Sequence, residues 1–433
     1  MAHVGNLIVV GTYEEFVLGY AIVPEEYDEK KLSLVQTFAC HSHRASVRSL
    51  AVGGVHLASG STDETIRLYN TLNQVESGML THHNGSVNAL AFTEDGTHLI
   101  TAGDDGMIAV VQTGSWFVEK QWAGTHSGAA VTGLSIHPSG KIALSVGADN
   151  RIVTWNLVKG RKAYVANVSS RCRNGWGVGD VQWSPSGSCY AVFMATHAEV
   201  YSVATAGVTH TITCSSRVTS MTFLEDDILL VGEESGEASI HKLMPSTSAG
   251  QEGDLKEIAR FQAHEKRVKS ARNFGPVVDG ARSATQFVTA GGSGRICLWE
   301  LEDSEVSKLC EVGTGCRITS MAVVDLDKEL KLKKEDDAAQ KALLSDTKKK
   351  IKNENEAKKR KHADVQEVSG SSNGNKASLK VTKANGRDSS QKKRNGMKFS
   401  CELQEAKPTK SPRKKAKKVK GVNAGQWVVT PLE

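Results

Sequence analysis

The 433-residue sequence contains no hydrophobic run that approaches the ~18 apolar residues of a membrane-spanning helix. Its first stretch, MAHVGNLIVVGTYEE, has no basic segment, and the apolar run in it is too short for a signal peptide. The eight cysteines include no CxxC pair, and no Cys/His cluster has the spacing of zinc ligands. We therefore expect a soluble intracellular protein with no membrane contact, whose cysteines are reduced and bind no metal.

Catalytic motifs are also missing from the sequence. It has neither a GxSxG nucleophile elbow nor an HExxH zinc motif. Lys141 in PSGKIA lacks the upstream glycine and the following Ser or Thr of a phosphate-binding loop. The stretch GWGVG at 175–179 has no strand–helix context, which favours a simple loop. These absences predict a protein that is not an enzyme and that holds no cofactor.

Charge is divided unevenly along the chain, although the net charge is only +6. Residues 327–433 carry 29 Lys and Arg against 14 Asp and Glu, a net charge of +15. Residues 1–326 carry 25 basic against 34 acidic side chains, a net charge of −9. We therefore predict a globular domain over 1–326 and a Lys-rich tail over 327–433. A basic arm on an acidic body favours polyanionic partners such as RNA, or import receptors.

The sequence does contain a repeated unit. SGSTDETIRLYN at 59–70 returns as TAGDDGMIAVVQ at 101–112 and as SVGADNRIVTWN at 145–156. In each copy a polar tight turn separates two short β-rich segments. Seven copies occur at spacings of 40 to 58 residues, near the ~40–45 residues of a propeller blade. The residues that close the seven units are Tyr20, Tyr69, Val111, Trp155, Tyr201, His241 and Trp299.

Seven short opening strands accompany these units, each with a β-branched residue near its start. They read SVRSLAV (46), SVNALAF (86), AVTGLSI (130), GVGDVQW (177), RVTSMTF (217), RVKSARN (267) and RITSMAV (317). The first turn unit, at 11–20, has no opening strand before it, and RITSMAV has no turn unit after it. We therefore expect one blade to combine both ends of the domain, because an open ring would expose two sheet edges. The predicted fold is an all-β, seven-bladed propeller closed by N-terminal strands and a C-terminal strand.

The pattern resembles the WD-repeat β-propellers. In that family a His before the opening strand, a Ser or Thr, a turn Asp and a Trp form a buried hydrogen-bonded set in each blade. The resemblance implies that such sets are His43, Ser59, Asp63 and Tyr69; His83, Thr101 and Asp105; and His126, Ser145, Asp149 and Trp155. Ser, His and Asp together also suggest hydrolysis. Their recurrence in successive blades favours a structural role, because one active site is not repeated around a ring.

The later blades depart from this pattern. The fourth, YAVFMATHAEVYSV, has lost the turn Asp, and the fifth and sixth carry Ser235 and Ser293 at that position. Two insertions, at 245–254 and 275–284, are expected to be surface loops.

A candidate binding surface comes from the residue just before the β-branched position of the opening strand. In WD-repeat proteins this residue lies on the narrow face near the central channel. Here it is Arg217, Arg267 and Arg317 in three consecutive blades, with Lys266 beside the second and Trp176 in a nearby loop. One interpretation is an arc that grips an acidic peptide or an RNA backbone, with Trp176 as a stacking face. The other is a set of ordinary solvated loop arginines.

The tail differs from the rest of the chain. Residues 327–361 have charges of both signs and no Gly or Pro, which is typical of a solvated helix, and residues 362–433 are expected to be mostly disordered. Ser411 precedes Pro and basic residues, so a proline-directed kinase could add negative charge there. Basic clusters favour nuclear entry and retention on RNA. The cluster residues we single out are Lys358, Lys359, Arg360, Lys361, Arg413, Lys414, Lys415, Lys417 and Lys418.

Several stretches together resemble one particular family. They are VVGTYEEFVLGY, HSHRASVRSLAV with LASGSTDETIRLYN, WSPSG at 183, TSMTFLEDD with LLVGEESG, and the Lys-rich tail. Over residues 1–326 the chain is similar to the p21-activated protein kinase-interacting protein 1-like family. That resemblance implies a nucleolar scaffold in large (60S) ribosomal subunit assembly, bound to pre-ribosomal proteins or rRNA and monomeric within that assembly. It also implies, as an alternative, an adaptor that restrains p21-activated kinase. A propeller in chromatin or ubiquitin-ligase assemblies is a third alternative.

Overall fold

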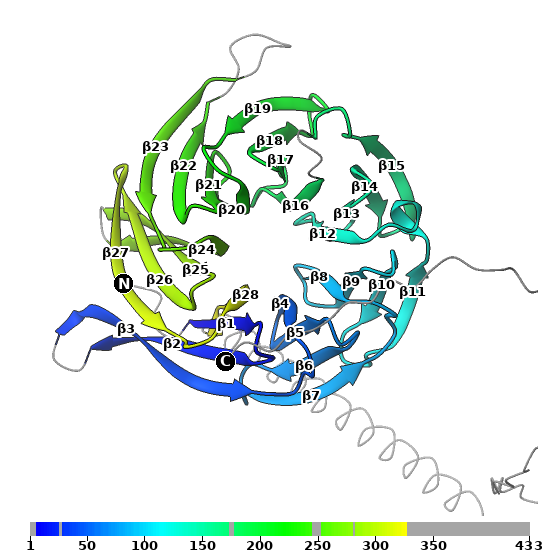
Figure 1. Cartoon of the computed structure of the whole chain (residues 1–433), viewed down its shortest axis with the longest axis horizontal. Helices are drawn as coiled ribbons and strands as arrows, with labels where there is room; N and C mark the ends of the chain where they lie inside the picture. The colour runs from blue at the N-terminus through cyan, green and yellow to red at the C-terminus, as the bar shows by residue number, and fades with distance from the viewer. Residues whose placement is uncertain (1–5, 26–27, 173–176, 245–252, 280–281, 327–433) are drawn as a thin grey trace, which may run out of the picture. The chain divides into compact units, whose positions relative to one another are not determined.

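The described part of the chain is a ring of β-sheets. The computed structural model describes residues 6–25, 28–172, 177–244, 253–279 and 282–326. These residues form seven four-stranded antiparallel sheets, which follow one another around a central opening (Figure 1). The predicted seven-bladed β-propeller is confirmed.

Each blade begins with an inner strand at the central opening and ends with an outer strand at the rim. Blade 1 has β4 (Val47–Gly53), β5 (His56–Ser61), β6 (Ile66–Asn70) and β7 (Val75–Leu80); blade 2 has β8 (Val87–Phe92), β9 (His98–Gly103), β10 (Ile108–Gln112) and β11 (Val118–Trp122). Blade 3 has β12 (Val131–Ile136), β13 (Ile142–Gly147), β14 (Arg151–Asn156) and β15 (Arg161–Asn167); blade 4 has β16 (Val178–Trp183), β17 (Cys189–Met194), β18 (His197–Ser202) and β19 (Gly207–Thr213). Blade 5 has β20 (Val218–Glu225), β21 (Ile228–Glu233), β22 (Glu237–Leu243) and β23 (Leu255–Gln262); blade 6 has β24 (Val268–Asp279), β25 (Arg282–Gly291), β26 (Arg295–Glu302) and β27 (Glu305–Gly313). Blade 7 has β28 (Ile318–Val324), β1 (Leu7–Thr12), β2 (Val17–Glu25) and β3 (Asp28–Cys40), and one 3₁₀ turn, η1 (Thr125–Gly128), precedes blade 3.

Blade 7 is built from both ends of the domain, as the offset between the two sequence signatures predicts. β28 pairs antiparallel with β1, and Val10 lies opposite Met321 in the register. Outside the ladder, the Tyr13 N–H donates to the Arg317 carbonyl at 2.8 Å, and the Thr319 hydroxyl donates to the Gly11 carbonyl at 2.9 Å. Pairing of β28 with β1 gives β1 a partner on each side and completes the four-stranded sheet, of which β28 is the inner edge.

The hydrophobic core lies between neighbouring blades. All six residues of β1 are buried, whereas β15, at the outer edge of blade 3, is exposed almost throughout. One buried cluster joins Ile100 and Ile108 of blade 2 to Leu134 and Trp155 of blade 3. Each sheet therefore covers the face of the next, and the repeat exists because a single four-stranded sheet cannot bury its own faces.

Glycines at the end of the second strand allow this close stacking. A Cβ atom on Gly60 of β5 would lie 2.6 Å from Val87 Cγ1, at the start of blade 2. A Cβ atom on Gly232 of β21 would lie 2.7 Å from Val268, at the start of blade 6. Both distances are shorter than a real carbon contact, so these positions admit no side chain without movement of the neighbouring blade.

One of the two insertions is a hairpin and not a loop. Residues 275–284 lie largely within β24 and β25, with Val277 opposite Ala284 and Asp279 opposite Arg282 in the register. The prediction of a surface loop there is wrong, because the backbone on both sides continues the antiparallel pairing of β24 with β25. In the other insertion, residues 245–252 lie outside the described residues, as do Trp176 and the whole tail from 327 to 433, including Ser411.

The structure also bears on membrane-spanning helices and on the state of the cysteines, for the residues that it describes. No helix in the described ranges is long and apolar enough to cross a membrane. The seven cysteines that the structure describes are all free thiols.

Candidate functional site in the central channel

Hydrogen-bonded sets connect the strands within blades 1 to 3. In blade 1, His43 Nδ1 lies 3.0 Å from Asp63 Oδ2, and His43 Nε2 lies 2.7 Å from Ser59 Oγ, which also donates to the Tyr69 hydroxyl at 3.4 Å. The backbone N–H of Arg44 donates to Asp63 at 2.9 Å. Burial lowers the pKa of His43, although Asp63 acts in the opposite direction.

Blades 2 and 3 repeat this geometry. His83 lies 2.9 Å from Asp105 and 2.8 Å from Thr101. His126 lies 2.9 Å from Asp149 and 2.7 Å from Ser145, which accepts a hydrogen bond from Trp155 Nε1 at 2.9 Å. The central hydroxyls Ser59, Thr101 and Ser145 are completely buried. A completely buried hydroxyl is not accessible to solvent, so this geometry favours a structural role in which each set joins strands of one blade.

Blade 6 has an incomplete set that the sequence analysis did not identify. His264 Nε2 lies 2.8 Å from the Thr289 hydroxyl, which also accepts a hydrogen bond from Trp299 Nε1 at 2.9 Å. Ser293 replaces the aspartate, and neither its Oγ nor His264 Nδ1 has a hydrogen-bond partner among the described residues. Burial lowers the pKa of His264 to about 4.

Blades 4 and 5 use buried glutamates in place of the His–Asp pair. Glu233 of β21 is fully buried and accepts hydrogen bonds from Ser215, from Ser216 and from Arg260 of β23. Burial alone would raise the pKa of Glu233, but these hydrogen bonds bring it below its ordinary value. In blade 4, Glu199 accepts hydrogen bonds from Arg171 at 3.1 Å and from the Tyr201 hydroxyl at 2.7 Å. The sequence pattern of His, Ser or Thr, turn Asp and Trp contains no glutamate, so it predicts neither network.

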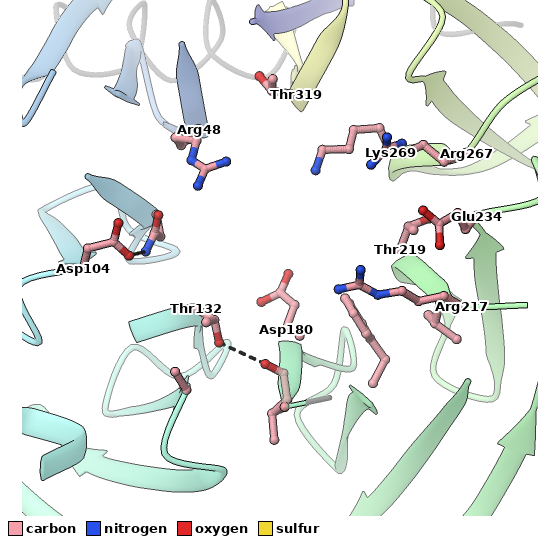
Figure 2. Close-up of a pocket in the computed structure, with 17 residues that line it drawn as sticks. Arg48, Asp104, Thr132, Asp180, Arg217, Thr219, Glu234, Arg267, Lys269 and Thr319 are labelled. Atoms are coloured by element: carbon pink, nitrogen blue, oxygen red, sulfur yellow. Dashed lines mark hydrogen bonds between the residues drawn. The ribbon is translucent and has the colours of Figure 1, made fainter. Parts of the chain in front are cut away.

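A cavity occupies the central channel of the ring. It has a volume of about 730 Å³, and side chains from several blades project into it (Figure 2). A smaller cavity of about 160 Å³ shares part of this lining. The charged residues of the larger cavity are Arg48, Asp104, Asp180, Arg217, Glu234, Arg267 and Lys269.

A β-bulge in every blade supplies the innermost ring of side chains. The register of each inner strand shifts at the residue that follows its β-branched opening residue. A bulge leaves one residue out of the ladder and redirects its side chain. All seven of these residues line the channel, and in chain order they are Arg48, Asn88, Thr132, Gly179, Thr219, Lys269 and Thr319.

The structure separates the residues of the predicted basic arc. Arg217 and Arg267 line the channel, whereas Arg317 and Lys266 are not part of its lining. Arg317 Nε lies 3.2 Å from Glu14 Oε1, and its guanidinium lies over the Tyr13 ring at 4.0 Å from the centroid. The three arginines therefore do not form one arc. Sequence reasoning missed Arg48 and Lys269, although both directly follow the valine that opens their strand.

Charge in the channel is distributed unevenly around the ring. Blades 5, 6, 7 and 1 form one side, which carries four cations and a single carboxylate, that of Glu234 in blade 5. Asp104 of blade 2 and Asp180 of blade 4 lie on the other side (Figure 2). The four cations are Arg48, Arg217, Arg267 and Lys269.

This environment shifts the pKa of two channel residues. Burial lowers the pKa of Lys269, and the positive charges of Arg267, Arg48 and Arg217 add to this effect. Desolvation by the surrounding protein raises the pKa of Asp180 to about 6. The hydrogen bond from the Val181 N–H and the positive charge of Arg272 lower this pKa, but their effect is smaller.

The arrangement of charges in the channel is suited to binding an anionic ligand. Within the described ranges, no group of three or more His, Cys, Asp or Glu side chains is placed to hold a metal ion. The cationic side of the channel offers guanidinium and ammonium donors to a ligand that carries localised negative charge.

The seven blades and their hydrogen-bonded sets define the class of WD-repeat β-propellers. Residues 32–70, 74–111 and 121–156 match the profile of the WD domain, G-beta repeat. The p21-activated protein kinase-interacting protein 1-like of Xenopus laevis is 37% identical over 319 residues, which cover 73% of this chain and 81% of that protein. The chain therefore belongs to the p21-activated protein kinase-interacting protein 1 family.

Two further relatives are similar over about three quarters of this chain. The p21-activated protein kinase-interacting protein 1 of Homo sapiens is 33% identical over 322 residues, covering 73% of this chain and 76% of that protein. Protein MAK11 of Saccharomyces cerevisiae is 26% identical over 367 residues, covering 76% of this chain and 86% of that protein.

Proposed function

We propose that this protein is a non-enzymatic nucleolar scaffold in large (60S) ribosomal subunit biogenesis, which binds pre-ribosomal proteins or rRNA. The observation that carries this proposal is the distribution of positive charge. Residues 1–326 have a net charge of −9, yet one side of the channel has four converging cations, and residues 327–433 add a net charge of +15. Such a chain binds anionic partners both at the channel and along residues 327–433. Ribosome precursors contain such partners in abundance.

The two regions have different roles in this proposal. The ring positions a partner at the channel, where Arg217 and Arg267 contribute donors. The basic clusters at 358–361 and 413–418 serve import and retention on RNA, and a phosphate on Ser411 would weaken that retention by adding negative charge beside them.

The second candidate function is that of a signalling adaptor. Relatives at 33% to 37% identity are named p21-activated protein kinase-interacting proteins. In this alternative the ring binds the kinase and lowers its activity. The adaptor function requires no ribosomal RNA, which gives a direct means of separating the two proposals.

Sedimentation of a nuclear extract tests the proposed function. The tagged full-length chain is run on a sucrose gradient, and the RNA that co-purifies with it is sequenced. We expect co-sedimentation with large-subunit precursors, and weaker co-sedimentation after deletion of 327–433. A light peak without ribosomal RNA would contradict the proposal, and kinase recovered in that peak would support the adaptor.

A further inference from the structure

The innermost residues of the channel fall into two groups with different roles. In three blades the bulge side chain donates to a backbone carbonyl at the start of the next blade. Asn88 donates to Val131 at 3.1 Å, and Thr132 donates to Val178 at 3.2 Å. Thr219 makes the same bond to the first residue of β24 at 2.6 Å. At these positions the side chain connects adjacent blades.

Arg48 and Lys269 occupy the same bulge position but make no such connection. Neither of them, nor Arg267, has a hydrogen bond or ion pair from its side chain to any residue that the structure describes. Lys269 instead lies within the positive field of three arginines, which destabilises its charged form. Three such cations that converge beside Arg217 repel one another and cost folding energy. Because the fold gains nothing from placing these three cations together, their clustering is better explained by a negatively charged ligand that binds between them.

The cations lie at two depths of the channel. Arg217 and Arg267 come immediately before β20 and β24, whereas Lys269 and Arg48 are the second residues of their strands. Two residues of a strand span about 6 Å. The two cavities agree with this placement, because Arg48 and Lys269 line both of them, whereas Arg217 and Arg267 line only the larger one.

We propose that the cationic side of the channel binds an extended acidic peptide of a partner protein, through two carboxylates two residues apart. In an extended peptide, side chains at i and i+2 point to the same side and lie about 6 to 7 Å apart, which matches the two levels of cations. Asp104 and Asp180 on the opposite wall repel a continuous polyanion such as single-stranded RNA. A peptide with neutral residues between its carboxylates avoids that repulsion.

This inference rests on the proposed scaffold role of the ring, and it names the chemistry of the partner at the same site. Its test uses the purified full-length chain and fluorescein-labelled synthetic peptides, measured by fluorescence anisotropy. The probe contains Asp-Gly-Asp between neutral residues. A peptide of the same composition with adjacent aspartates tests the spacing, and an Asn-Gly-Asn peptide tests the charge.

We expect the Asp-Gly-Asp peptide to bind several-fold more tightly than the peptide with adjacent aspartates, and its affinity to fall as salt is added. Lys269→Gln and Arg267→Gln should each weaken binding about tenfold, because each removes a charged donor. Lys266→Gln is the matched control, since Lys266 is exposed and lies outside the channel lining, and it should change affinity by less than about twofold.

The melting temperature of each variant shows whether a loss of peptide binding is caused by a loss of folding. Lys269→Gln should leave the melting temperature unchanged or raise it, because the side chain has no described partner and its charge is repelled. Absence of peptide binding, or equal binding by the Lys269→Gln variant, would overturn the inference. So would tighter binding of an oligouridylate of equal charge that depends on Lys269. Peptide binding by a chain that fails to sediment with ribosome precursors would refute the proposed function and leave this inference intact.

Discussion

Single partly buried carboxylates make the stability of this propeller depend on pH. Burial on its own would raise the pKa of Asp63, but hydrogen bonds from the Arg44 N–H, from Thr65 and from His43 bring it down to about 2. A carboxyl group whose pKa in the folded state is below its ordinary value of 3.8 stabilises the folded protein when it is ionised. This stabilisation is complete when the pH is above the ordinary pKa of 3.8, and it is lost as the pH falls through the folded-state pKa of about 2.

Asp63→Asn tests this dependence. We expect the variant to lose about 2 kcal/mol of unfolding free energy at pH 7, and the difference from the native chain to shrink as the pH falls from 4 to 2. Urea unfolding at several pH values measures both quantities. Glu305→Gln is the control, because Glu305 is exposed on β27. A stability difference that stays constant with pH would contradict the assignment.

The incomplete set of blade 6 allows a stabilising substitution. Ser293 stands where blades 1 to 3 have aspartate, and His264 Nδ1 lacks a partner among the described residues. Ser293→Asp should supply that acceptor, stabilise the chain by about 1 kcal/mol and raise the pKa of His264 from about 4.

Calorimetry and imidazole NMR measure these two effects of Ser293→Asp. Ser293→Ala is the control, and it should change stability little because the serine hydroxyl has no described partner. An unchanged His264 titration in the Ser293→Asp variant would show that the carboxylate does not reach the imidazole.

At the scale of the strands, glycine sets how closely neighbouring blades approach. Gly60→Ala would place a methyl group 2.6 Å from both Ser49 Oγ and Val87 Cγ1. We expect a loss of roughly 1–3 kcal/mol, because the packed interface has no free space to relax into. Gly78→Ala is the matched control on β7, where the nearest atom to the added carbon is 3.8 Å away. Equal melting temperatures for the two variants would contradict this role of Gly60.

Strand periodicity explains what could be predicted about the elements and what could not. The opening strands and turn units were predictable because each carries a local pattern of β-branched residues and a polar turn. The hairpin over 275–284 was missed because an insertion has no counterpart in the other blades to compare with. Arg48 and Lys269 were missed because a bulge, and not the regular strand alternation, directs them into the channel. The Glu233–Arg260 pair joins two strands that no sequence spacing relates.

At the scale of the whole molecule, the offset of the two sequence signatures made the closure of the ring predictable. Blade 7 takes β28 from residues near 320 and β1 to β3 from the first 40 residues. The ring therefore closes only when the two ends of the domain meet, and every other blade depends on that closure to keep its neighbours in place.

Deletion of residues 1–23 tests this dependence. It removes β1 and most of β2, and with them Leu7, Ile8, Val9 and Val10, which are completely buried. At about 2 kcal/mol for each side chain, about 8 kcal/mol of burial is lost, which is comparable with the entire stability of a typical domain. We therefore expect the truncated chain to lose its cooperative melting transition and not merely to melt at a lower temperature. A synthetic peptide of residues 1–23 should restore the transition by pairing with β28, whereas a cooperative transition without the peptide would show that six blades are stable on their own.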